Sequence, residues 1–114
     1  MSEANLSEAN LERAILNYAD LSEANLSEAK LVNADLIDAD LSGATLIEAN
    51  LIDANLSEAN LSGADLSEAY MNIANLSHAN LTNVCMTDAF LPNAYLMYTD
   101  LCEANLRGTE VMHG

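Results

Sequence analysis

The sequence predicts an all-β solenoid, in which the chain winds through short sides and tight corners into stacked coils. Two observations lead to this fold. A five-residue phrase, Ala-Asn-Leu followed by two variable residues, runs through the 114 residues without losing its phase. On an α-helix a step of five residues turns about 140° beyond a full circle, so the leucines would form no apolar stripe.

Each phrase divides into a side and a corner. In Ala49-Asn50-Leu51, the alternation of a strand turns Ala49 and Leu51 to one face and Asn50 to the other. Ile52 and Asp53 must then turn a corner to restore the phase. The inward leucines of the most regular part form the predicted core: Leu36, Leu41, Leu46, Leu51, Leu56 and Leu61.

The residues at the corners support this division. Gly43, Gly63 and Gly108 stand at the second corner position, where a type II turn requires positive φ. Asparagine tolerates the same region and occupies the position at Asn33, Asn83 and Asn93. Pro92 stands at the first corner position, where its fixed φ fits.

The tandem Ala-(Asp/Asn)-Leu-x-x phrase resembles the pentapeptide-repeat family over essentially the whole chain. The resemblance implies a right-handed quadrilateral β-helix of about 22 repeats, four to a coil, in one domain spanning residues 1–114. A subset of the family resembles duplex DNA in size, shape and charge, dimerises end to end, and protects DNA gyrase from quinolones. Resemblance to that subset implies a type II topoisomerase as a partner.

Residues 1–68 keep close to the phrase. The first ten residues begin directly in phase, and residues 11–35 carry the first irregular side chains: Arg13, Ile15, Tyr18 and Lys30. Residues 36–68 are nearly ideal. With four phrases to a coil, Val32 and Ile52 stack on the outside, which is compatible with a small apolar patch or with the strand preference of β-branched residues.

From residue 69 the five-residue repeat becomes less regular. Met71, Met86 and Val84 replace inward residues, and Thr99 and Thr109 take inward alanine positions, where each hydroxyl needs a backbone partner. Aromatic and Met side chains gather outside, as in protein interfaces. One interpretation is an array decaying at its end; the other is a dimer interface in the C-terminal coil, formed by Phe90, Tyr95, Met97, Tyr98, Val111 and Met112.

Charge is the strongest constraint on function. Eighteen acidic residues face three basic ones, for a net charge of −15, so direct binding of nucleic acid is not expected. With four phrases to a coil, every fourth phrase shares a corner, and five acids fall in one column that forms a candidate acidic interaction face: Glu8, Glu28, Glu48, Glu68 and Asp88. The charge is compatible with simple solubility and with imitation of DNA.

Candidate catalytic and metal sites fail on spacing. A calcium loop beginning at Asp38 would need Glu in its twelfth position, which is Ala49. His78 is expected at the surface between Glu58 and Tyr98. Cys85 and Cys102 supply too few ligands for zinc. We therefore expect no enzyme activity, no catalytic residue and no metal or other cofactor.

Two functions remain open. The first is a non-catalytic β-helical scaffold or protein-interaction module that forms a homodimer through its C-terminal coil. The second is a DNA mimic that binds a type II topoisomerase such as DNA gyrase. The first residues lack a basic and apolar signal segment, and no apolar run approaches a membrane span, so a cytoplasmic location without membrane contact is expected.

Overall fold

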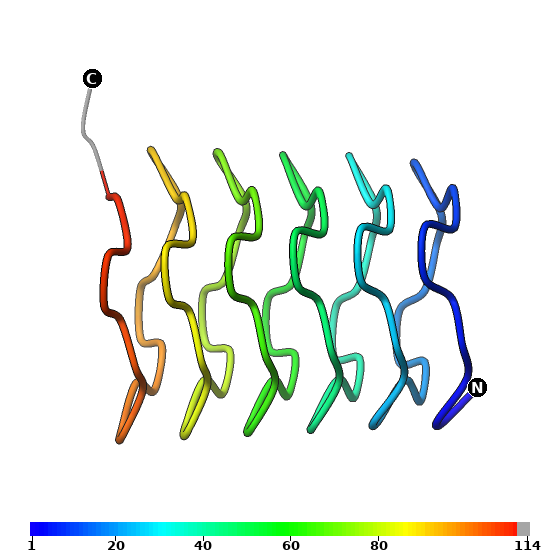
Figure 1. Ribbon diagram of the computed structural model, residues 1–114, viewed down its shortest axis with the longest axis horizontal. Helices are drawn as coiled ribbons and strands as arrows, with labels where there is room; N and C mark the ends of the chain where they lie inside the picture. The colour runs from blue at the N-terminus through cyan, green and yellow to red at the C-terminus, as the bar shows by residue number, and fades with distance from the viewer. Residues whose placement is uncertain (112–114) are drawn as a thin grey trace.

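The computed structural model describes residues 1–111, which form a stack of coils along one long axis (Figure 1). Parallel bridges join each phrase to the fourth phrase after it, from Asn5 and Asn25 at one end to Phe90 and Glu110 at the other. A turn occurs in every phrase. Each coil therefore has four corners and four walls, as the family resemblance implies.

The β structure consists of single bridges instead of the three-residue strands that the sequence predicts. Within residues 1–111 there is no named strand and no helix, and the bridges recur at every fifth residue from Asn5 to Glu110. The cause is the corner, because its two residues and the alanine that closes it leave only two residues per side, too few for a regular strand, and only the first of them is bridged between coils. Consistent with this absence, nothing in that range could serve as a membrane-spanning helix.

Every backbone N–H group of a regular phrase has a hydrogen-bond partner, as residues 56–60 show. Leu56 and Glu58 donate to the next coil at 2.7 and 2.9 Å, and Asn60 donates to the previous coil at 2.9 Å. Ala59 closes the corner on the carbonyl of Leu56 at 3.0 Å. The remaining donor, the N–H of Ser57, bonds to the side chain of Asn55 at 3.1 Å. Since buried backbone groups must be paired, this pattern explains why Asn or Asp stands before most corners.

Aspartate fills the same role as asparagine. Asp20 accepts from the hydroxyl and the N–H of Ser22 at 2.7 and 3.1 Å. These two bonds favour the ionised carboxylate and lower the pKa of Asp20. Both residues permitted at this position thus serve the corner, and aspartate adds charge to the surface.

The second corner position has positive φ throughout, from 52° at Ile73 to 71° at Gly108. Glycine and asparagine mark this conformation in the sequence, but half of these positions carry Glu or Asp at a similar φ. The left-handed region costs a residue with a Cβ about 1–2 kcal/mol. Wherever a further coil follows, pairing between coils holds these residues there, because they donate their N–H groups to that coil, as Glu48 does to Ser67 at 3.0 Å.

The core is a single stack of Ala and Leu running from Leu21 to Leu91. The six predicted core leucines, Leu36 to Leu61, are no more than 1% exposed. Met71, Val84 and Met86 keep the stack filled where the phrase departs from Ala and Leu. Val32 and Ile52, predicted as an outside patch, are half-buried at the first corner position.

Candidate interaction surface

The acidic column lies along one corner of the solenoid. Its members occupy the second corner position of successive coils, with φ between 58° and 60°, and all are exposed: Glu8, Glu28, Glu48, Glu68 and Asp88. Like charges one coil apart repel each other, with only water to screen them. The column ends at Gly108, where a Cβ would collide with the Asp88 carboxylate. Glycine therefore leaves room for the last carboxylate.

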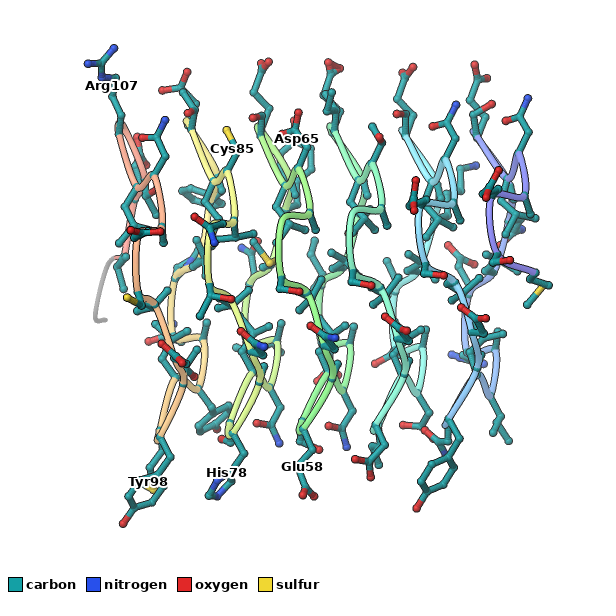
Figure 2. All side chains as sticks on the ribbon, turned by 90° about the horizontal axis from the view of Figure 1, so that it is seen from below. Glu58, Asp65, His78, Cys85, Tyr98 and Arg107 are labelled. Carbon is teal, nitrogen blue, oxygen red and sulfur yellow. The ribbon has the colours of Figure 1, made fainter. Side chains whose placement is uncertain are left out.

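A second corner carries two stacked rings. The His78 and Tyr98 rings lie one coil apart, with centroids 5.0 Å from each other and an interplanar angle of 18°. Figure 2 shows Glu58, His78 and Tyr98 in a row on the opposite side of the molecule from Asp65, Cys85 and Arg107. The predicted surface position of His78 is confirmed. No group of three His, Cys, Asp or Glu side chains in the described part of the chain could hold a metal ion.

Cys85 belongs to a hydrogen-bonded chain on one wall. Hydroxyls of Ser67 and Thr87 lie 3.3 and 3.4 Å from its sulfur, and such bonds lower the pKa of the Cys85 thiol, against the nearby charge of Asp65. Ser67 has one hydroxyl proton, however, and donates it to Asp65 at 2.6 Å. The proton of Ser67 is thus directed to Asp65, and in the contact between Cys85 and Thr87 either the thiol or the hydroxyl can donate. The hydrogen-bonded chain links Asp65, Ser67, Cys85 and Thr87 across two coils.

The residues predicted to form one C-terminal interface lie on different faces. Consecutive phrases face consecutive walls, so Phe90 and Tyr95 point from adjacent walls, while Met97 and Tyr98 form the following corner. Exposed fractions are 61% for Tyr95, 67% for Met97 and 76% for Tyr98, whereas Phe90 is half-buried. Val111 lies at the end of the coil, and Met112 is outside the described residues. The structure therefore distributes these residues around the C-terminal part of the solenoid, because each phrase turns the chain by one wall.

Phe90 has a close aromatic neighbour, as the spacing of four phrases to a coil predicts. It pairs by a parallel bridge with Tyr70, one coil earlier on the same wall, and Tyr70 is 49% exposed. Ile73, at the adjoining corner, is 42% exposed. Beside it, the Oδ1 atom of Asn72 is buried without a hydrogen-bond partner. The equivalent oxygen of Asn17 accepts from the backbone N–H one coil on at 2.9 Å, a donor that Pro92 lacks.

An apolar hollow of about 180 Å³ opens at the C-terminal end of the stack. Its lining consists mostly of inward leucines of the last coil: Met86, Leu91, Leu96, Leu101, Leu106, Thr109 and Val111. The predicted backbone partners of the inward threonines are present, since Thr99 donates to Leu76 and Thr109 to Met86, both at 2.8 Å. The sequence did not indicate the hollow, because these leucines carry the same phrase as buried ones.

Near the other end, a wide depression of about 400 Å³ is lined by polar residues and one valine: Asn10, Glu12, Arg13, Val32 and Asn33. The clustering of Arg13 with these side chains was also not predicted. The depression holds one base beside one acid and no buried polar group that points to a ligand.

Comparison with known proteins gives a consistent result. A family model described as pentapeptide repeats (8 copies) matches residues 4–43, 34–72 and 74–110. A crystal structure of a pentapeptide repeat protein from the cyanobacterium Cyanothece 51142 is 32% identical, with a TM-score of 0.89 and coverage of 98% of this chain and 88% of that one. The chain is thus a right-handed β-helix solenoid. The predicted number of about 22 repeats is not supported by these matches.

Other solved structures are less similar. A pentapeptide repeat protein from the thylakoid lumen of Arabidopsis thaliana is 34% identical over 83% of this chain and 63% of that one, with a TM-score of 0.46. QnrB1, a plasmid-mediated fluoroquinolone resistance protein, is 22% identical over 93% of this chain and 65% of that one, with a TM-score of 0.39. With TM-scores of 0.46 and 0.39, these two structures do not indicate a function for this chain. No curated protein matches the sequence.

Proposed function

The chain belongs to the pentapeptide-repeat family, and from that premise we propose that it is a non-catalytic scaffold that binds proteins through its outer surface. One observation carries this proposal: large exposed apolar side chains are concentrated in the C-terminal half of the solenoid, on a backbone that is hydrogen-bonded from coil to coil. They are Tyr70, Ile73, Tyr95, Met97 and Tyr98. A rigid frame with such side chains loses little conformational entropy on binding.

The end of the stack adds a route to self-association. We propose a homodimer through the C-terminal coil, in which the apolar hollow formed by Leu96, Leu101, Leu106 and Val111 is covered by a second copy. Exposed apolar hollows rimmed by polar groups are typical of protein contacts. Tyr95, Met97 and Tyr98 would form the rim.

Sedimentation equilibrium of paired variants tests the homodimer. Leu101→Glu places a charge in the hollow and should give monomer, while Leu11→Glu alters a half-buried leucine near the other end and should leave the dimer intact. A monomeric native protein, or equal loss with both variants, would contradict the C-terminal homodimer. The wider scaffold function is tested by capture of a protein partner from the native host on the immobilised chain.

A second candidate function rests on the acidic column. Five exposed carboxylates at successive coils give a line of negative charge along the axis, and a protein surface built for DNA could bind it. We therefore keep the imitation of DNA toward DNA gyrase as the alternative. In a gyrase supercoiling assay, inhibition or quinolone protection that disappears on substituting Glu28, Glu48 and Glu68 by Gln would favour it. Absence of any effect at high micromolar protein would exclude it.

A further inference from the structure

The acidic column and the Tyr70–Phe90 pair are neighbours on the surface. Glu68 lies two residues before Tyr70 and Asp88 two residues before Phe90, so each coil carries a corner carboxylate followed by a ring on the next wall. The bridge between Tyr70 and Phe90 stacks the two units directly. The result is a wall with two rings, flanked on one side by two exposed carboxylates.

The other side of the same wall is partly apolar. Ile73 is 42% exposed at the adjoining corner beside Asn72, and Pro92 stands in the same corner one coil on, next to the exposed Asn93. The rings therefore lie between an anionic border and one in which Ile73 and Pro92 alternate with asparagine. A lysine or arginine side chain matches this arrangement, because its aliphatic stem packs on apolar surface while its charged head reaches an anion. A cation over an aromatic face gains further attraction from the ring.

We propose that this wall, named here the Tyr70–Phe90 wall and consisting of Glu68, Tyr70, Ile73, Asp88, Phe90 and Pro92, is the docking site of a protein segment that carries at least two lysine or arginine residues. The inference rests on the proposed scaffold function and names the class of partner.

Charge complementarity selects this occupant. A second copy of the chain brings another net charge of −15 and the same acidic column, so it is repelled at this wall. Nucleic acid and anionic lipid are repelled for the same reason. A basic segment is attracted, and it also relieves the repulsion between Glu68 and Asp88, which lie one coil apart in the column.

The probe is a short fluorescent peptide of alternating lysine and alanine, whose binding to the full chain is measured by fluorescence anisotropy. Tyr70→Ser combined with Phe90→Ser keeps the charge and should weaken binding by more than about tenfold. Glu68→Gln combined with Asp88→Asn should do the same. The matched control is Asp38→Asn with Glu58→Gln, which removes the same two charges one coil apart at another corner and should change affinity little. Circular dichroism verifies that each variant keeps the β-helix.

The outcomes separate this inference from the proposed function. Equal weakening by the control pair would mean general attraction to an acidic protein and would overturn the assigned wall. Full affinity of the Tyr70→Ser and Phe90→Ser variant would also overturn the assigned wall. The same holds if the native protein does not bind the peptide at low salt. A peptide of acetylated lysines keeps the stems and loses the charge, so undiminished binding of that peptide would also overturn it. In each case the self-association test and partner capture still decide the scaffold function independently.

Discussion

Leu56 and Leu101 occupy the same position of the same phrase, yet only Leu56 is fully buried. Leu56 lies in the middle coils, residues 21–91, where each coil has a neighbour on both sides. Leu101 lies in the C-terminal coil, residues 92–111, beyond which the described chain contains no further coil. In a solenoid, therefore, an inward position makes burial possible, and the neighbouring coils determine how much of it is realised.

The difference extends to the backbone. In the middle coils Leu56 and Glu58 donate their N–H groups to the coil that follows. The C-terminal coil bonds backward, as Tyr95 does to Ala74 at 2.9 Å, and its inward threonines add hydroxyl bonds to the same coil. We infer that the middle coils supply most of the stability, while the C-terminal coil keeps surface available for contacts.

The largest expected effect is a cavity in the middle. Leu56→Ala should lower the free energy of unfolding by about 2–5 kcal/mol, because the surrounding coils cannot close the space. Leu101→Ala should cost less than about half as much, since its site already opens to the hollow. Urea unfolding followed by circular dichroism measures both. Equal losses of unfolding free energy for the two variants would contradict the difference between the middle coils and the C-terminal coil.

A larger inward side chain should also destabilise the middle coils more than the C-terminal coil. Ala54 is 1% exposed, so Ala54→Leu should destabilise the protein by about 1–3 kcal/mol. Ala104 is half-buried, and Ala104→Leu should be nearly neutral. Thermal unfolding compares the two variants with the native chain, and an unchanged transition for Ala54→Leu would contradict the narrow interior.

A smaller effect concerns the hydroxyl bonds of the C-terminal coil. Thr99→Val keeps the shape of the side chain but removes the donor to the Leu76 carbonyl, which should cost about 1 kcal/mol. Hydrogen exchange should become faster in residues 92–111 and stay unchanged in the middle coils. Faster exchange throughout the molecule would show that the C-terminal coil does not open separately.

The smallest expected effect is the same in both regions. Glu58 and Glu103 both have φ of 61°, a conformation that asparagine tolerates better than glutamate. Glu58→Asn and Glu103→Asn should each raise stability by about 0.5 kcal/mol, since part of the left-handed cost is removed. A gain at only one of the two positions, measured by urea unfolding, would mean that corner strain depends on the neighbouring coils.

Much of the molecule could be read from the sequence because the phrase itself carries the geometry. The alternation of Ala49, Asn50 and Leu51 predicts the inward face, and Gly43 and Pro92 predict the corners. The stacking of His78 between Glu58 and Tyr98 followed from four phrases to a coil. The prediction of three-residue strands was wrong, because the corners shorten each side. The predicted interface residues Phe90, Tyr95 and Val111 lie on different faces of the solenoid, because successive phrases face different walls.

The sequence by itself determined the period, the inward alanines and leucines and the corner positions, because these depend on residues within one or two phrases of each other. Only the tertiary structure decided which leucines are fully buried, that glutamates hold positive φ, that Ser67 stands between Asp65 and Cys85, and that a hollow opens beside Leu101. Each of these depends on a contact between coils, where the partner lies about a whole coil away along the chain, beyond the reach of a pattern read within one or two phrases.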